Sequence, residues 1–100
     1  MAFTIIVSLY AKDGKDVEEQ VRTKLAEAAQ TFSNEDGVLE YYPMQNANDS
    51  RKWTIVERYD DESSVAKRRE KSNVKAFAES LLALLENGKE SLSVHQFKEL

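Results

Sequence analysis

The sequence contains no cysteine, and His95 is its only histidine. The missing thiols exclude disulfides, zinc ribbons, iron–sulfur clusters and cysteine nucleophiles. A single histidine cannot form a His-rich metal site, and Glu62, Glu70 and Glu79 are spaced like solvated helix charges, so we predict no metal site. Glycine-rich phosphate loops and the Gly-x-Ser-x-Gly elbow are absent too, which leaves nucleotide chemistry and serine hydrolysis without support.

An excess of positive charge is also missing, because 14 basic residues stand against 18 acidic residues and give a net charge of −4. This balance offers no general attraction to phosphate backbones or anionic lipids, so we expect no nucleic-acid partner. The one dense basic cluster, Lys67-Arg68-Arg69 with Lys71, is typical of a solvated helix face.

Long apolar runs are missing as well, and none approaches the roughly 20 residues that span a bilayer. The partly apolar stretch 2–11 has no basic residues before it and alternates with polar side chains, which is typical of a strand and not of a signal peptide. We therefore expect a cytoplasmic protein with no membrane partner.

Glycines are few, and Gly14, Gly37 and Gly88 each fall between segments of different periodicity. Period-2 alternation or β-rich composition predicts four strands, at 3–11, 38–45, 53–59 and 91–97. Helical spacing of apolar residues predicts three helices, at about 16–32, 65–71 and 72–85. Asp16 with Glu19 is predicted to form a capping box at the start of the first helix.

These elements predict one α+β domain over residues 1–100, in the order β-α-β-β-α-β. That order is typical of a ferredoxin-like fold, a four-stranded antiparallel sheet with helices on one face. The second strand lies at an edge in this topology, where Pro43 is tolerated. The opposite face carries Ile6 and Val56 and is too apolar for full solvation, so we expect a second sheet to cover it in a homodimer.

The most informative segment is WTIVERY at 53–59, which leads directly into a helix. Strand parity places Trp53, Ile55, Glu57 and Tyr59 on one face, which the apolar residues of the first strand predict to be the helix-covered face. A buried carboxylate costs free energy unless it has a partner, so Glu57 should either have one or be functional. The nearest positive candidate is Arg68, eleven residues later.

The same segments carry a family resemblance. They are the first strand with Lys12-Asp13-Gly14-Lys15, the long helix, residues 34–41 (NEDGVLEY), residues 53–59, and the helix through 73–77 (NVKAF). Together they resemble the antibiotic biosynthesis monooxygenase (ABM) family over nearly the whole chain. The resemblance implies a dimeric α/β barrel of ferredoxin-like protomers, each with a pocket between sheet and helices. For some members it also implies oxidation of an aromatic polyketide or quinol without metal or flavin.

Within this resemblance, Glu57 falls where many members have a strand glutamate, and Tyr59 where many have a tryptophan. Arg68 stands where many members have a histidine, which puts histidine acid–base chemistry in doubt there and makes an Arg68–Glu57 ion pair possible. The haem-degrading branch has Asn, Trp and His at positions that align with Val7, Arg68 and Ala78. Haem degradation is therefore not expected.

One candidate site follows from these observations. Its catalytic candidates are Glu57, Arg68 and His95, and its substrate-binding candidates are Trp53, Tyr59, Tyr42, Val7 and Phe77. Core or interface packing explains the aromatic residues equally well, and a solvated or interface position explains His95. We predict a cofactor-independent monooxygenase that acts on a small phenolic, quinol or polyketide-like molecule. The alternative is a non-catalytic dimeric barrel that binds a small hydrophobic ligand or has a structural or stress-related role.

Overall fold

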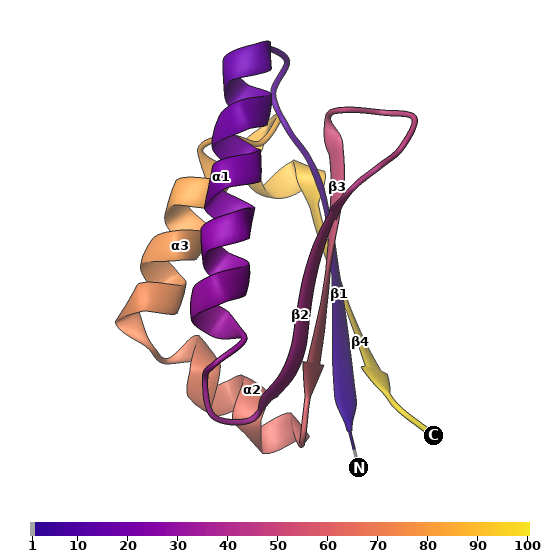
Figure 1. Cartoon of the computed structure of the whole chain (residues 1–100), viewed down its shortest axis with the longest axis vertical. Helices are drawn as coiled ribbons and strands as arrows, with labels where there is room; N and C mark the ends of the chain where they lie inside the picture. Colours follow the sequence, from indigo (N-terminus) through magenta and orange to yellow (C-terminus); the bar gives the residue numbers. More distant parts are fainter. Residues whose placement is uncertain (1) are drawn as a thin grey trace.

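The computed structural model describes residues 2–100. Its elements are β1 (Phe3–Tyr10), α1 (Lys15–Phe32), β2 (Val38–Gln45), β3 (Lys52–Tyr59), α2 (Glu62–Arg69), α3 (Ser72–Leu82), the 3-10 helix η1 (Gly88–Ser91) and β4 (Leu92–Lys98). The strands form one antiparallel sheet in the order β2-β3-β1-β4, and the helices lie on one side of it (Figure 1). The predicted α+β, ferredoxin-like βαββαβ fold is confirmed. Pro43 lies on the edge strand β2, where a missing backbone donor is tolerated.

The register of the strands fixes which side chains face the helices. Ile5 of β1 pairs with Glu57 of β3, and Val7 of β1 pairs with both Ile55 and Val94. Successive residues of a strand point to opposite faces, so these side chains all point toward the helices. The four predicted inward residues of β3, from Trp53 to Tyr59, are indeed buried.

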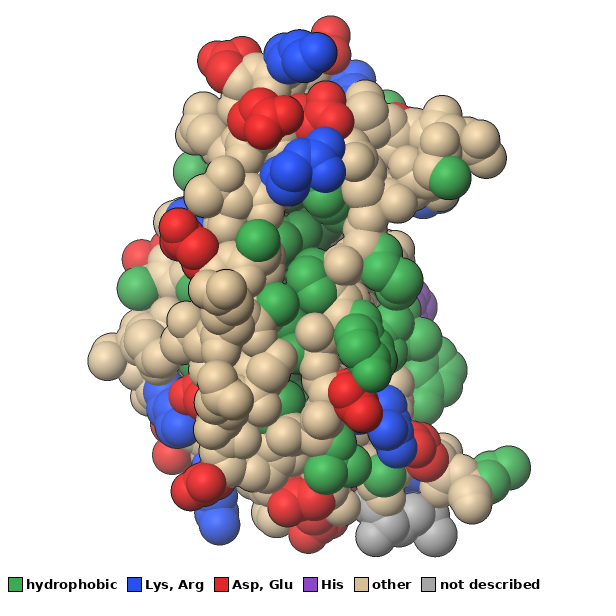
Figure 2. All heavy atoms as spheres, in the orientation of Figure 1, with side chains coloured by type: hydrophobic (Ala, Val, Ile, Leu, Met, Phe, Trp, Pro, Cys, Tyr) green, Lys and Arg blue, Asp and Glu red, His purple; other side chains and the backbone are tan. Residues whose placement is uncertain are grey.

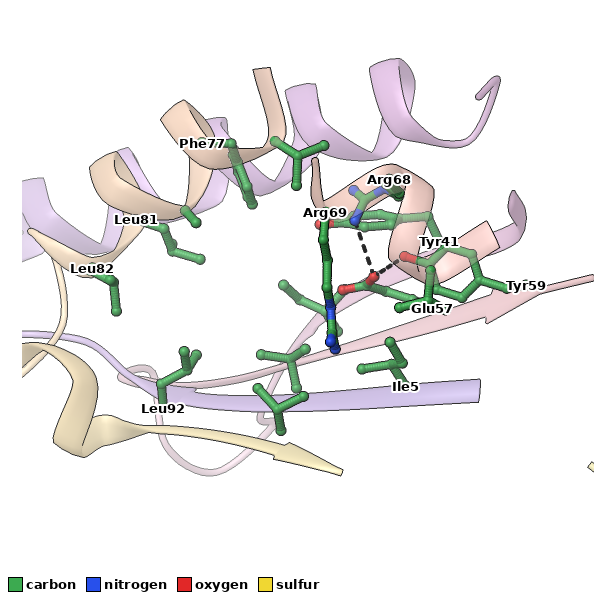
Figure 3. A pocket seen from close by; sticks show the side chains of 16 residues that line it. Ile5, Tyr41, Glu57, Tyr59, Arg68, Arg69, Phe77, Leu81, Leu82 and Leu92 are labelled. Carbon is green, nitrogen blue, oxygen red and sulfur yellow. Dashed lines mark hydrogen bonds and ion pairs between the residues drawn. The ribbon is translucent and has the colours of Figure 1, made fainter. Parts of the chain in front are cut away.

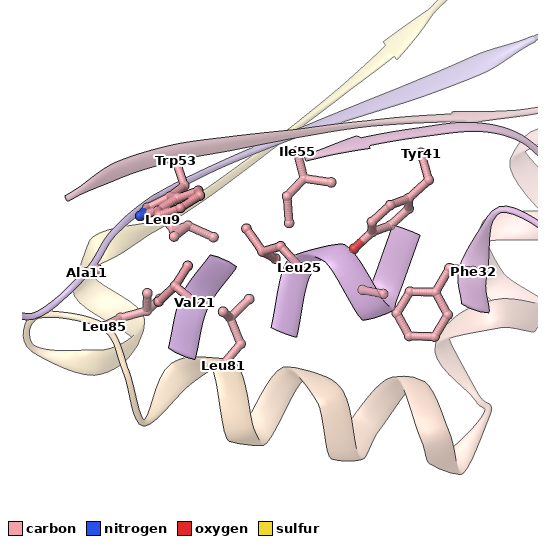
Figure 4. Close-up of a cluster of buried hydrophobic side chains, with 11 residues drawn as sticks. Leu9, Ala11, Val21, Leu25, Phe32, Tyr41, Trp53, Ile55, Leu81 and Leu85 are labelled. Atoms are coloured by element: carbon pink, nitrogen blue, oxygen red, sulfur yellow. The ribbon is translucent and has the colours of Figure 1, made fainter. Parts of the chain in front are cut away.

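The main core lies between α1 and the sheet (Figure 4). The buried residues of α1 are Val21, Leu25, Ala28 and Phe32, which form one stripe because their spacings of four and three match the helical period. The Phe32 ring packs edge-on against Tyr41 at 5.6 Å and against Phe77 at 5.3 Å between ring centres. Each fully buried side chain of this size stabilises the fold by about 1.5–3 kcal/mol. The pair of contacts fixes the end of α1 against both β2 and α3.

The first helix begins at Lys15, close to its predicted start, but the predicted capping box is wrong. Gly14 precedes the helix with φ of 125°, a backbone conformation that glycine adopts without strain, and no side chain caps the helix. Asp16 therefore lies in the first turn and does not form a capping box with Glu19. Its carboxylate still interacts favourably with the positive end of the helix dipole there.

The predicted end of the last helix is also wrong, because α3 stops at Leu82 and not at 85. The apolar spacing continues, but the backbone beyond Leu82 bonds to the end of β1. Glu86 N donates to Tyr10 O at 3.0 Å, and Lys12 N donates to Leu84 O at 2.9 Å. Tight turns with local hydrogen bonds, such as Leu85 N to Leu82 O at 3.1 Å, combine here with these tertiary hydrogen bonds in place of the α-helical pattern.

The face of the sheet that points away from the helices is partly apolar. One row across all four strands consists of Tyr42, Val56, Ile6 and His95. Tyr42, Met44 and Phe97 are 50%, 47% and 49% exposed on this outer face. Figure 2 shows hydrophobic side chains gathered over the strands on that side of the molecule. No element between residues 2 and 100 covers the face. None of the helices in this range is long and apolar enough to cross a membrane.

Candidate functional site

An apolar pocket of about 230 Å³ lies between the sheet and the helices α2 and α3 (Figure 3). Its walls consist of eleven aliphatic or phenylalanine side chains, two tyrosines and three charged residues. The sheet contributes residues of the inward face, including Ile5, Val7 and Ile55. Helix α3 contributes Phe77 and Leu81 from the other side. The composition is that of a small-molecule site, with many apolar walls and a few polar groups.

Glu57 is the acidic residue of the pocket, and it is 8% exposed. The hydroxyl of Tyr59 donates a hydrogen bond to Glu57 Oε1. Arg68 Nη1 lies 3.5 Å from the same oxygen. The Arg68–Glu57 pair that the sequence made possible is therefore present, and it compensates the buried carboxylate.

Arg68 is held by more than this pair. Its guanidinium carbon lies 4.3 Å from the centre of the Phe32 ring and 5.7 Å from that of Tyr41. Its Nε lies 3.6 Å from Glu35 Oε1, and Lys71 Nζ lies 2.9 Å from Glu35 Oε2. Stacking on aromatic faces suits the planar, weakly hydrated guanidinium. The buried Arg68 thus lies between two carboxylates and two rings.

Helix α2 places Arg68 over the strand because its start is tightly anchored. Asp61 caps the helix by accepting a hydrogen bond from Glu62 N at 2.8 Å. Asp60 N donates to Gly37 O at 2.9 Å, and a Cβ at Gly37 would lie 2.5 Å from Ser64 Oγ. Only glycine fits this approach between the start of β2 and α2.

Two tyrosine hydroxyls of the pocket stay protonated. Burial, followed by the negative charge of Glu57 and the hydrogen bond to it, raises the pKa of Tyr59 far above its usual value. Burial and the Glu57 charge also raise the pKa of Tyr41, and the Arg68 guanidinium opposes this only in part. Both phenols therefore keep their protons at neutral pH; Tyr59 donates its hydrogen bond to Glu57, and the Tyr41 hydroxyl is the donor that a ligand could use.

The structure brings together five of the eight predicted site residues: Glu57, Arg68, Tyr59, Val7 and Phe77. It does not bring the other three to the pocket. Trp53 is 3% exposed in the main core, where Arg22 lies 5.5 Å from its ring centre. Tyr42 and His95 lie on the outer face, because both belong to the row that pairs through Ile6 and Val56. The hydroxyl of Tyr42 donates to Glu40 Oε2 there, at 2.6 Å.

The sequence argument missed two pocket residues, Tyr41 and Arg69. Tyr41 and Tyr42 are adjacent on β2 and point to opposite faces, and a register shift between Val38 and Glu40 decides which of them faces inward. Arg69 was interpreted as a solvated charge. The signal for it is weak, because only the position of α2 at the pocket distinguishes it from its neighbour Lys67.

Between residues 2 and 100, no group of three or more His, Asp or Glu side chains is placed to hold a metal ion. The pocket itself contains one carboxylate, Glu57, and no histidine. The chemical groups that the arrangement offers are one carboxylate, two protonated phenols and two guanidinium groups around an apolar space.

A model of the antibiotic biosynthesis monooxygenase family matches residues 2–80. The chain belongs to this family. No curated protein matches the sequence. The ABM chain shares its fold with solved structures that are distant in sequence, so the likeness concerns the fold alone.

Three of these solved structures show how similar in fold and how distant in sequence they are. A conserved protein from Methanosarcina mazei has a TM-score of 0.87 and 14% identity, covering 100% of this chain and 94% of that one. A protein from Pseudomonas aeruginosa has a TM-score of 0.83 and 22% identity, covering 99% and 94%. A mutant of SnoaB, a cofactor-independent oxygenase from Streptomyces nogalater, has a TM-score of 0.82 and 11% identity, covering 98% and 92%.

Proposed function

We propose that this ABM protein is a cofactor-independent monooxygenase that oxidises a small aromatic molecule, phenolic, quinol or polyketide-like, in the pocket between the sheet and α2–α3. The observation that carries the proposal is Glu57, a buried carboxylate at the wall of an apolar pocket that Arg68 and Tyr59 hold in place. Family membership and the fold shared with SnoaB support the same class of reaction.

The chemistry requires a substrate that is acidic enough to lose a proton and electron-rich enough to reduce dioxygen. A phenolic aromatic ketone with an acidic CH₂ group, as in an anthrone, meets both conditions. Glu57 would accept the proton from this group. Arg68 would stabilise the resulting anion, and the protonated hydroxyl of Tyr41 would donate a hydrogen bond to one of its oxygens, while the Tyr59 hydroxyl holds Glu57 in place. The apolar walls would exclude water from the reactive anion.

The atoms balance without a further reductant. The substrate CH₂ carbon loses two hydrogens and gains one oxygen atom, which is a four-electron oxidation to a carbonyl. Dioxygen accepts the four electrons, and its second oxygen atom leaves as water with the two hydrogens. The substrate is thus the only electron donor, and Glu57 returns to its ionised form when its proton leaves with the water.

Oxygen uptake tests this proposal. The protein would be treated with chelator and supplied with a panel of anthrones and hydroquinones in an oxygen electrode. We expect uptake with at least one anthrone, a carbonyl product, and a rate that Glu57→Gln lowers by about 100-fold. Glu79→Gln, at an exposed position of α3, is the control and should leave the rate unchanged. No uptake with any compound, or uptake that chelator abolishes and one metal restores, would reject the proposal.

A specific observation also favours the alternative of a non-catalytic barrel that binds a small hydrophobic ligand or has a structural role. Glu57 is engaged by both Tyr59 and Arg68, and Arg68 by Glu35 as well. Such a network also suits a purely structural ion pair. Tight binding of an aromatic ligand without oxygen uptake would favour this function.

The outer face of the sheet supports a proposal about assembly. We infer that a second copy covers it and makes a homodimeric barrel of two facing sheets. Exposed Tyr42, Met44 and Phe97 lie beside the half-buried Ile6 and Val56, an apolar surface that burial against another sheet would stabilise. The cytoplasmic location that we expect remains a prediction.

A further inference from the structure

The charges that line the pocket do not cancel. Its three charged residues are Glu57, Arg68 and Arg69. Glu57 and Arg68 neutralise one another at 3.5 Å, and Glu35 occupies the other side of the Arg68 guanidinium. The side chain of Arg69 makes neither an ion pair nor a hydrogen bond with any residue from 2 to 100. The pocket therefore carries one net positive charge, in a chain whose net charge is −4.

Arg69 lies where the pocket opens. The exposed residues among the lining are Arg69 at the end of α2, Ala78 on α3 and Val94 on the edge strand β4. These three define a mouth between the helices and β4. Figure 3 shows the Arg69 side chain extended from α2 toward the sheet, beside apolar side chains. Its charge therefore stands at the entrance of an apolar space and not deep inside it.

An interaction with the helix dipole does not by itself explain why the Arg69 side chain extends toward the sheet. A positive charge in the last turn of α2 interacts favourably with the helix dipole, and Lys67 and Arg68 supply the same interaction. Lys67 borders a different, shallow hollow with Asp36, Asp60 and Lys71. Arg69 is the residue of this turn whose charge has no carboxylate beside it and whose side chain lines apolar walls.

We infer that the pocket selects an aromatic ligand that carries a carboxylate, with the rings among the apolar walls and the carboxylate on Arg69 at the mouth. An apolar cavity of about 150 Å³ holds one benzene molecule. The 230 Å³ of this pocket leave room for a fused-ring system larger than benzene. A guanidinium pairs with a carboxylate in a two-pronged geometry, which also orients the rings. The inference rests on the proposed function in that it takes the same pocket as the substrate site.

Binding of a matched pair of probes tests it. 2-Naphthoate carries the carboxylate, and 2-naphthamide has the same shape without the charge. Titration calorimetry of the parent protein should give an affinity for naphthoate about tenfold higher than for naphthamide. Arg69→Gln should bring the two affinities together by weakening naphthoate alone. Lys67→Gln removes the same charge from the same helix turn and should keep the preference.

Equal affinities in the parent, or binding of neither probe, would overturn the inference. An equal loss of preference in Lys67→Gln would also overturn it, because the effect would then come from diffuse charge and not from Arg69. The readout involves no turnover. A lack of oxygen uptake would therefore reject the proposed oxygenase and leave this inference standing. A lack of preference for the carboxylate would reject this inference and leave the proposed oxygenase standing.

Discussion

The guanidinium carbon of Arg68 lies 4.3 Å from the centre of the Phe32 ring, so the last turn of α2 is packed on the last turn of α1 through one cation and one aromatic face. The same Arg68 reaches Glu57 on β3 at 3.5 Å. One buried side chain thereby joins the sheet, the long helix and the helix that covers the pocket. Its removal should affect folding and the site together.

Arg68→Ala should lower the free energy of unfolding by about 3 kcal/mol, because it leaves the buried carboxylate of Glu57 and the partly buried carboxylate of Glu35 with fewer partners. Urea denaturation followed by circular dichroism measures this. The control, Lys67→Ala on the exposed side of the same helix, should change the value by no more than about 0.5 kcal/mol. An Arg68→Ala variant as stable as the parent would show that the pair contributes nothing to folding.

Glu57→Gln and Glu35→Gln should affect different properties of the protein. Glu57 lines the pocket, so its replacement should alter ligand binding or turnover, while Glu35 remains 3.6 Å from Arg68 to keep the fold. Glu35 does not line the pocket and also pairs with Lys71, so its replacement should alter urea stability and leave naphthoate affinity unchanged. If both variants behaved alike in calorimetry and denaturation, Glu57 would have no special part in the site.

Tyr59 should make the protein sensitive to alkali. Burial and the neighbouring Glu57 raise its pKa in the folded state, whereas an unfolded tyrosine loses its proton near pH 10. The contribution to stability is therefore complete below pH 10 and is lost as pH rises above it, by up to about 1.4 kcal/mol per pH unit. Unfolding free energies of the parent and of Tyr59→Phe, measured between pH 9 and 11, should show a steeper fall in the parent. Parallel curves would argue against a shifted Tyr59.

Glu99 should make the stability of the protein depend on pH in the acid range. Hydrogen bonds from Arg58 and then from Thr4 lower its pKa to about 2. Its stabilisation is present above about pH 4.5, the ordinary value, and is lost as pH falls toward 2. The parent should exceed Glu99→Gln in stability at pH 7, and the difference should vanish toward pH 2 and shrink in high salt. A difference that does not depend on pH would contradict this.

Assembly through the outer face predicts a species of twice 11.4 kDa in sedimentation at micromolar concentration. Phe97→Glu places a charge on that face opposite Thr4 and should shift the protein toward monomer. Gln20→Glu, at an exposed position of α1, adds the same single negative charge and is the control. A parent protein that sediments as a stable 11.4 kDa species would exclude the dimer.

The fold was predictable because periodicity is a local property of the chain. Alternation along Trp53–Tyr59 gave the correct buried face of β3, and with it the inward position of Glu57. Helical spacing located α1 and α3, although the end of α3 is set by hydrogen bonds to β1 that no local pattern contains.

The site was predictable only in part, because it depends on relations between elements. Trp53 has the right parity but lies too far along β3, under α1 and outside the pocket. His95 faces outward because β4 pairs with β1 so that it stands opposite Ile6, and the mixed composition of the last strand does not reveal this register. Arg69 lines the pocket because of how α2 is placed over the sheet, which follows from the anchor at Gly37.

The alternation along β3 separates substitutions that affect the pocket from substitutions that affect the outer face of the sheet. Ile55, Glu57 and Tyr59 point into the pocket, while Thr54, Val56 and Arg58 point to the outer face, so no residue of this strand belongs to both surfaces. Substitutions that change which molecule the pocket accepts can therefore accumulate without disturbing how the outer face pairs, and the reverse is equally true. A fold of this kind can keep one assembly while its chemistry diverges.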